Sequence, residues 1–354
     1  MVYNLFQPEM EGRKIMKTTF GKTRDGRQAF LYEISWGSLK AQISDYGATL
    51  VRLYVPDSKG NLADVVLGFD SVEGYDHHGA YFGATVGRNA NRVGKGRFPI
   101  GEKLVQMPIN DNSNNLHSGP ESYAHRLWKV EKHTENSIRF SLESPNGDQG
   151  MPGNAYVSVT YTLEYPGALR LSYDAVCDRD TVFNLTNHSY FNLAGHHRPE
   201  KAMEQVLMLT SRHFTPADRE SIPTGEKRNV AGTPMDFRVP KPIGRDIEAD
   251  DPCLKLQGGY DHNFEVFAQP FAILTDPESG RSMSVSTDLP GVQFYSGNFL
   301  SGEQGKDGVN YIRRGGVALE TQFYPNSVNH PDWKQPFFKA GQHFCSETVY
   351  KFQW

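Results

Sequence analysis

The stretch Val157-Ser-Val-Thr-Tyr-Thr-Leu-Glu-Tyr165 alternates apolar and polar side chains without a break. Successive side chains of a β-strand point to opposite faces of a sheet, so the apolar half, Val157 through Tyr165, would share one buried face. Pro166-Gly167 then interrupts the pattern, and Leu169–Ala175 alternates again. This arrangement predicts two antiparallel strands joined by a tight turn.

Shorter runs of the same kind recur along the whole chain. They are Phe30–Trp36, Leu39–Ser44, Thr49–Val55, Ser137–Leu142, Phe271–Thr275, Ser282–Thr287, Val292–Tyr295, Gly316–Glu320 and Thr348–Phe352, with 34 glycines and 21 prolines as punctuation. No long segment has the 3.6-residue periodicity of a helix, and only Asp70–His78 and Pro216–Glu220 are expected to hold short helices. The pattern predicts an all-β fold, a large antiparallel sandwich or barrel.

Composition gives no sign of a second domain. The chain has 354 residues, and no shift in composition marks a boundary within it. We expect residues 16–354 to form a single domain, preceded by a loosely attached leader over residues 1–15, with Met16 as an alternative start. The polar stretches Ala194–Met203 and Asn229–Tyr260 are expected to be long loops on that domain.

Charge and hydropathy narrow the classes of partner. The formal net charge is −4 without basic runs, whereas a nucleic-acid-binding surface must be positive, so no nucleic acid is expected. Mean hydropathy is −0.57, no apolar run reaches transmembrane length, and the first residues are too polar for a signal peptide. Cys177, Cys253 and Cys345 show neither metal spacing nor a disulfide framework, which favours reduced thiols in a cytoplasmic protein away from membranes.

The segment Phe183–Gly195 contains a candidate proton-transfer group. It places His188 between Asn187 and Ser189, with Tyr190-Phe191 behind. The unperturbed pKa of imidazole lies near neutrality, so a histidine gives and takes a proton at little cost. A buried histidine whose polar neighbours satisfy its hydrogen bonds fits the same pattern, and partners elsewhere in the chain must decide.

Further clusters carry polar side chains among glycines, amides or aromatics. They are Gly87–Val93 with Asn91 and Arg92, Asn114–Gly119 with His117, Gly258–Phe264 with Asp261, Gly316–Ser327 with Glu320, and Val292–Asn298 with Gln293. Each also has a plain structural reading, such as a solvated turn, a core histidine, a turn-forming aspartate or a salt-bridged glutamate. Glu320 at the end of an apolar strand would be partly desolvated, which raises its pKa and makes it a better base.

Together these side chains suit a sugar. Amides and carboxylates match hydroxyl groups, and aromatic rings pack on the apolar faces of a sugar ring. Most of the 17 tyrosines and 21 phenylalanines belong to a core, but some are available to line a saccharide pocket.

These clusters, in this order along the chain, resemble the aldose 1-epimerase (galactose mutarotase) family. The residues that carry the resemblance are Asn91-Arg92, Leu116-His117, Thr186-Asn-His188, Asp261-His-Asn-Phe264, Glu320-Thr-Gln322 and Pro325-Asn-Ser327. Asp45-Tyr-Gly-Ala48, Ile222–Glu226 and Thr233–Arg238 support it. The likeness extends over nearly the whole chain, from about residue 17.

The resemblance implies a large antiparallel β-supersandwich with few short helices. It also implies an enzyme that interconverts the α and β anomers of free hexoses, such as D-galactose and D-glucose, without cofactor or metal. Glu320 would remove the proton of the C1 hydroxyl, His188 would protonate the ring oxygen, and His117 would assist beside both. Asn91, Arg92, Asp261 and Gln293 would hold ring hydroxyls. The expected partner is a free aldose, and the protein would be a monomer or homodimer.

The loop after His117 departs from the family pattern. The family usually continues Gly-Gly there, whereas this chain has Ser118-Gly119-Pro120. A serine adds a Cβ where glycine tolerates any backbone angle, so this loop puts the sugar preference in question.

Three other functions fit parts of the sequence. A glycoside hydrolase would use Asp261 and Glu320 as its carboxylates but would leave both histidines idle. A non-catalytic sugar-binding protein on the same fold would have no need of Glu320 and His188. A sugar-phosphate epimerase needs clustered cations, for which Arg88 and Arg92 are the candidates. Several other histidines, His77-His78, His196-His197 and His330, are assigned to structure because no pair has a metal-site spacing with a third ligand.

Overall fold

The computed structural model describes residues 16–76 and 78–354, so the predicted leader over residues 1–15 lies outside the described part. That part consists almost entirely of strands and loops. Its two α-helices are α1 (Val72–Asp76) and α2 (Pro252–Gln257). Short 3-10 turns occur at Gly94–Gly96, Tyr123–His125, Asp148–Gly150, Pro199–Glu204, Ile243–Arg245, Lys306–Gly308 and Ser327–Asn329.

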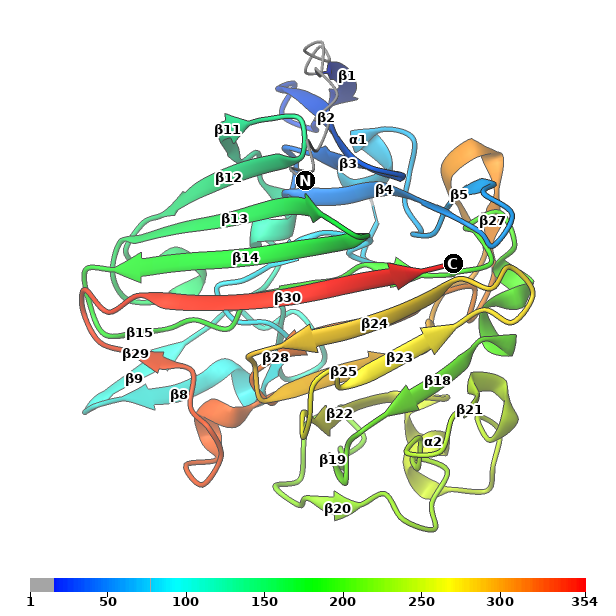
Figure 1. The fold of residues 1–354 in the computed structure, drawn as a ribbon. Helices are drawn as coiled ribbons and strands as arrows, with labels where there is room; N and C mark the ends of the chain where they lie inside the picture. The colour runs from blue at the N-terminus through cyan, green and yellow to red at the C-terminus, as the bar shows by residue number, and fades with distance from the viewer. Residues whose placement is uncertain (1–15, 77) are drawn as a thin grey trace, which may run out of the picture.

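The largest element is a nine-stranded antiparallel sheet, whose long strands cross Figure 1 side by side. Its order is β11 (Lys129–His133), β12 (Ser137–Ser144), β13 (Ala155–Glu164), β14 (Ala168–Cys177), β30 (Phe344–Gln353), β24 (Ser282–Thr287), β23 (Ala272–Thr275), β18 (Val206–Leu209) and β21 (Lys241–Pro242). The predicted hairpin is β13–β14, paired from Ala155–Cys177 to Glu164–Ala168. Its apolar positions Val157, Val159, Tyr161 and Leu163 are fully buried. Tyr165 was expected to share that face, but β13 ends before it and it is 86% exposed.

Two further sheets complete the layers. The five-stranded sheet runs β1 (Lys17–Lys22), β2 (Gln28–Trp36), β3 (Leu39–Ser44), β4 (Thr49–Pro56) and β5 (Leu62–Asp64). The six-stranded sheet runs β17 (Tyr190–Phe191), β28 (Val317–Gln322), β25 (Gly291–Tyr295), β22 (Asp261–Glu265), β19 (His213–Thr215) and β20 (Arg228–Asn229). Two-stranded pairs join β6 (Thr85–Val86) to β16 (Thr186–Asn187), β7 (Arg92–Val93) to β10 (Asn115–Leu116), β8 (Arg97–Ile100) to β9 (Lys103–Gln106), β15 (Thr181–Val182) to β29 (Phe337–Phe338), and β26 (Glu303–Gln304) to β27 (Asn310–Tyr311).

The main core lies between the nine-stranded and six-stranded sheets. Leu319 of β28 and Phe294 of β25 are register partners and belong to one buried cluster with Val159 of β13. Thr321 of β28 also bonds Thr348 of β30, with 2.6 Å between the two hydroxyl oxygens. Because side chains alternate along a strand, the even-numbered residues of β28 face away from this core. That second face of the six-stranded sheet carries the candidate site.

The two α-helices differ in how well the sequence predicted them. Helix α1 lies inside the predicted Asp70–His78, which confirms that prediction. The helix predicted at Pro216–Glu220 is wrong, because the Asp218 carboxylate accepts hydrogen bonds from the amides of Glu220 and Ile222 and closes a turn instead. Helix α2 was missed, although its signals are standard: Asp251 caps its N-terminus, Pro252 follows, and Gly258 ends it at φ 67°.

A strand forms at each of the alternating runs predicted from the sequence, and the ends of most strands differ from the predicted ends by no more than a few residues. The all-β, supersandwich fold class is therefore confirmed. No helix in residues 16–76 and 78–354 is both long and apolar enough to cross a membrane.

Candidate active site

A pocket of about 320 Å³ opens on the polar face of the six-stranded sheet. Six of the predicted site residues line it: Asn91, Arg92, His117, His188, Asp261 and Glu320. The rest of the wall comes from His78, Gly79, Ala80, Tyr81, Leu116, Tyr190, Tyr295, Phe299, Leu300 and Glu303.

The register of the six-stranded sheet brings Glu320, Gln293 and Asp261 together. Glu320 of β28 pairs directly with Gln293 of β25, so both side chains leave the same face of the sheet. Gln293 does not line the pocket, but its Nε2 donates to Asp261 Oδ1 at 2.7 Å and so fixes that carboxylate. Two expectations need correction: β28 continues to Gln322, so Glu320 lies within the strand, and Asp261 begins β22 rather than belonging to a turn.

His188 reaches the pocket from the short connection between β16 and β17. Tyr190 pairs with Ala318, and continuing that register by two residues places His188 opposite Glu320. The His188 amide donates to Ala84 O at 2.9 Å, and its carbonyl accepts from Gly83 N at 3.0 Å. Gly83 has φ 64°, and a Cβ there would lie 2.1 Å from Leu50 O, so the anchor requires glycine.

The alternative in which polar sequence neighbours satisfy the hydrogen bonds of the His188 ring does not hold for Asn187 and Ser189. Asn187 Oδ1 accepts from the Ser189 hydroxyl at 2.6 Å, and Asn187 Nδ2 donates to Gly83 O. Aromatic rings surround the imidazole instead: Tyr190 stacks at 5.1 Å between ring centres and Tyr81 at 5.9 Å. His188 is therefore packed between aromatic rings, and its Nδ1 is buried and has no hydrogen-bond partner among the described residues.

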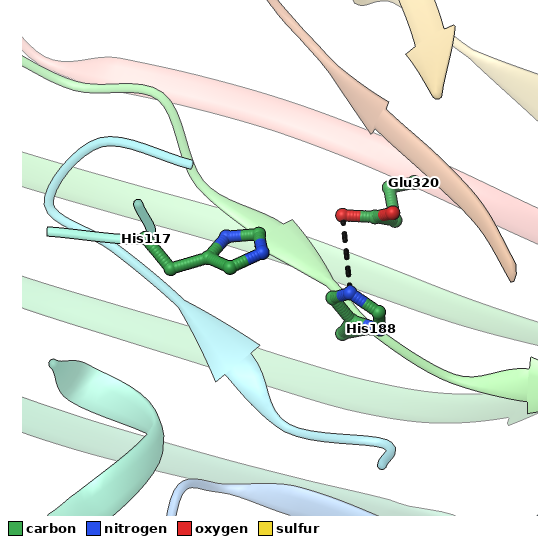
Figure 2. Close-up of side chains that lie close together, drawn as sticks. All are labelled: His117, His188 and Glu320. Carbon is green, nitrogen blue, oxygen red and sulfur yellow. Dashed lines mark ion pairs between the residues drawn. The ribbon is translucent and has the colours of Figure 1, made fainter. Parts of the chain in front are cut away.

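Figure 2 shows His188 and Glu320 facing one another, with 3.6 Å between Nε2 and Oε2. Burial lowers the pKa of His188 to about 4. Burial also raises the pKa of Glu320 well above its ordinary range, the Asp261 carboxylate adds to that increase, and Arg92 opposes it. A neutral imidazole with a neutral carboxyl carries the same number of protons as an imidazolium with a carboxylate. Between the lowered pKa of His188 and the raised pKa of Glu320, the pair therefore holds one proton, on either group.

His117 points into the pocket beside this pair (Figure 2). Its Nδ1 accepts a hydrogen bond from Asn91 N at 3.1 Å, so Nε2 carries the proton in the neutral ring. Burial lowers the pKa of His117 well below its ordinary value, and the positive potential of His188 and Arg92 lowers it further. His117 thus presents a neutral N–H donor to the pocket.

The two loops that carry Asn91 and His117 are held together by hydrogen bonds. His117 N donates to Asn91 O at 3.0 Å. Ser118 adds two more bonds: its Oγ accepts from Asn89 N at 2.8 Å and donates to Asn89 O at 3.0 Å. Ser118 has φ 69°, a backbone angle that favours glycine, but its side chain points at Asn89 and does not line the pocket. Ser118 therefore supports the loop and forms no part of the pocket wall.

The two arginines of Gly87–Val93 have different surroundings. Arg92 lines the pocket and pairs with Asp111 through Nε at 2.7 Å from Oδ2. Arg88 is fully buried and donates to neutral oxygens of Ser144, Pro152 and Thr181, away from the pocket. The pocket therefore lacks the pair of arginines that a phosphate group was expected to require.

Several pocket residues were missed from the sequence. His78 was assigned to structure, but it lines the wall, and its Nε2 lies 3.5 Å from Glu303 Oε1. Tyr81, at φ 56°, packs on His117 with 4.8 Å between ring centres. No pattern in a single sequence identifies an isolated tyrosine in a loop as part of a site. His196, assigned to structure, pairs with Asp307 outside the pocket, with 3.2 Å between Nε2 and Oδ2.

One atom each from His117, His188 and Glu320 lies within 4.8 Å of the others, a spacing at which three side chains could also hold a metal ion. The same closeness suits proton transfer, since a small group bound between them would reach a donor and an acceptor at once. Fold and site together define an all-β protein with a buried histidine–carboxylate pair in a pocket lined by polar and aromatic side chains.

Comparison with known proteins identifies the family. The family model described as Aldose 1-epimerase matches residues 31–351. The chain is 38% identical over 321 residues to the aldose 1-epimerase of Haemophilus influenzae, covering 89% of this chain and 93% of that protein. It is 39% identical over 344 residues to the galactose mutarotase of Mus musculus, covering 96% and 98%.

Solved structures agree with this result. A GalM/aldose epimerase homologue from C. elegans superimposes with a TM-score of 0.85 at 32% identity, covering 92% of this chain and 99% of that chain. Galactose 1-epimerase from Lactobacillus acidophilus superimposes with a TM-score of 0.84 at 27% identity, covering 96% and 98%. The chain belongs to the aldose 1-epimerase family and is an enzyme of the carbohydrate epimerase class.

Proposed function

We propose that this enzyme interconverts the α and β anomers of free hexoses, with D-galactose and D-glucose as substrates, by acid–base catalysed ring opening and closure. The observation that carries the proposal is the 3.6 Å approach of His188 Nε2 to Glu320 Oε2 within the pocket. Ring opening needs a proton removed from the C1 hydroxyl and a proton delivered to the ring oxygen, without a strong nucleophile. One carboxylate and one imidazole that share a single proton meet that need.

In the proposed step the shared proton starts on His188, which leaves Glu320 ionised. Glu320 accepts the proton of the C1 hydroxyl as the C1–O5 bond breaks, and His188 gives its proton to O5. The C1 aldehyde forms, the C1–C2 bond rotates, and O5 attacks the other face of C1 with both proton transfers reversed. The neutral His117 Nε2–H donates to the oxygen on which charge develops, and each acid or base contributes roughly 10²–10⁴-fold.

The remaining polar groups are assigned to the sugar hydroxyls. Arg92 offers donors, and Asp261 offers an acceptor oxygen beside the one held by Gln293. Asn91 Oδ1 accepts from Arg92 N at 2.8 Å, which directs its amide group as a donor. Gln293 acts by holding Asp261 in this assignment. We also propose that residues 16–354 act as one catalytic domain.

A panel of freshly dissolved α-anomers followed by polarimetry tests the proposal. Wild-type enzyme should speed the approach to equilibrium for D-galactose and D-glucose far above the buffer rate. A buffer-level rate with bound sugar would favour the non-catalytic sugar-binding alternative, and no effect on any free aldose would refute the proposal.

The sugar-phosphate alternative has less support. Arg88 is unavailable to a ligand because it is buried with its own partners, and Arg92 already faces the Asp111 carboxylate. Kinetics with galactose 6-phosphate beside galactose compare the two directly. A higher kcat/KM for the phosphorylated sugar would favour this alternative.

A further inference from the structure

A second cluster of ligand-type side chains lies far from the pocket, on the outer face of the nine-stranded sheet. It comprises Asp174 of β14, Cys345 of β30, and His343 just before β30. One ligand atom of each lies within 4.8 Å of the others. No step of the proposed sugar chemistry uses these groups.

The position of the cluster follows from strand register. Asp174 and Cys345 are direct cross-strand partners, so their side chains project from the same face. His343 precedes Cys345 by two positions and shares that face. Both strands lie inside the sheet: β14 pairs with β13 along its full length and with β30 over Ala168–Ala175, which includes the Asp174–Cys345 pair, while β24 covers the far end of β30 from Thr348 to Gln353. Ligands on central strands are held more firmly than ligands on loops.

The contacts within the cluster converge on one oxygen. Asp174 Oδ1 lies 2.6 Å from His343 Nδ1 and 3.9 Å from Cys345 Sγ. The other carboxylate oxygen, Oδ2, faces Arg139 at 3.8 Å from Nη2, so the arginine does not occupy the side shared by the thiol and imidazole. The Asp174 carboxylate beside the thiol and the imidazole therefore favours a cation.

We propose that Asp174, His343 and Cys345 bind one divalent metal ion with affinity for sulfur and nitrogen, of which Zn²⁺ is the representative. A thiolate, an imidazole and a carboxylate are ordinary Zn²⁺ ligands, and water completes a tetrahedral set. The metal takes the place of the two hydrogens that now connect these atoms: the thiol proton passes to the buffer, and the proton of the neutral imidazole moves from Nδ1 to Nε2. Thiolate and carboxylate together neutralise the two positive charges.

The test titrates the full-length, reduced protein with Co²⁺ alone and follows thiolate-to-Co²⁺ charge-transfer absorption in the near ultraviolet. The pocket cluster of His117, His188 and Glu320 contains no sulfur, so a metal bound there gives no such band. We expect one equivalent of Co²⁺ to produce the band and Zn²⁺ to displace it. Cys345→Ser should abolish the band, and His343→Ala should weaken binding at least about tenfold.

His213→Ala is the matched control. His213 Nδ1 lies 3.0 Å from Glu265 Oε2, a histidine–carboxylate pair of the same kind without a cysteine, and this variant should keep the band. Metal-free Cys345→Ser should retain wild-type mutarotation, which separates this proposal from the proposed function. Absence of the band in wild type, or an unchanged band in Cys345→Ser, would overturn the metal site even in a fully active enzyme.

Discussion

Ser118 offers a sharp prediction because serine stands where glycine is usual in the family. Its hydroxyl is the partner of both Asn89 N and Asn89 O, and both residues are buried. Ser118→Ala removes both bonds but keeps the Cβ at φ 69°. Ser118→Gly removes the same bonds and also relieves the backbone. Comparing the two variants therefore separates the effect of the lost hydrogen bonds on stability from the effect of the strained backbone.

The magnitudes follow from these contacts. A buried polar group left without a partner costs about 1–3 kcal/mol, so Ser118→Ala should lower the free energy of unfolding by about 2–4 kcal/mol. Glycine adopts the left-handed backbone angle without the Cβ penalty, which returns about 1–2 kcal/mol to the glycine variant, less about 0.5–1 kcal/mol for the greater freedom of unfolded glycine. Ser118→Gly should therefore be more stable than Ser118→Ala by roughly 1 kcal/mol.

Urea unfolding of the three proteins measures the difference, and polarimetry measures its effect on turnover. Because Ser118 lies next to His117, Ser118→Ala should lower kcat more than it raises KM. That effect on kcat should shrink when His117 is already replaced by asparagine. Equal stabilities of wild type and Ser118→Ala, or an undiminished kcat effect in the His117→Asn background, would refute the reasoning.

Three other perturbations have defined outcomes. Since the folded-state pKa of His188 is about 4, kcat/KM should fall as the pH drops through about 4, when the pair gains a second proton. It should fall again as the pH rises through the raised pKa of Glu320, when the pair loses the shared proton. A single transition near 6.5 in the pH–rate profile would contradict this. Lys306→Met should lower the free energy of unfolding in urea by about 3 kcal/mol, because the fully buried Lys306 ammonium lies 2.6 Å from Asp64. Lys339→Met breaks an exposed pair with Asp180 and should change that free energy far less. Equal losses in the two variants would disprove the role of the buried pair. Tyr81→Ala should reduce kcat about tenfold, because the His117 and His188 rings lose the ring that positions them. Tyr81→Phe keeps that ring and should retain activity. If steady-state kinetics show the same kcat for both variants, packing of the Tyr81 ring does not position the histidines.

Strand positions were readable from the sequence because burial on one face imposes a two-residue period. Val157 through Leu163 show it clearly, and the structure buries each apolar member of that run. Local hydrogen bonds defeated the prediction at Pro216–Glu220, since nothing in composition separates a turn closed by Asp218 from a first helical turn.

The candidate site was only partly readable. Polar residues inside apolar or glycine-rich segments, such as His188 and Glu320, stand out in a strand-forming chain, and six of the seven predicted residues line one pocket. Tyr81 and His78 did not stand out, because their place in the wall depends on how a loop folds over the sheet. The bonds of Ser118 to Asn89 also join residues 29 positions apart, which only tertiary structure discloses.

Glu320→Gln provides the decisive measurement, since the amide keeps the size of the side chain but cannot accept the sugar proton. Polarimetry with α-D-galactose should show the mutarotation rate of this variant reduced at least about 100-fold, while its unfolding transition stays cooperative. A variant that restores the anomeric equilibrium as fast as wild type would remove Glu320 from the chemistry and, with it, the paired-proton mechanism.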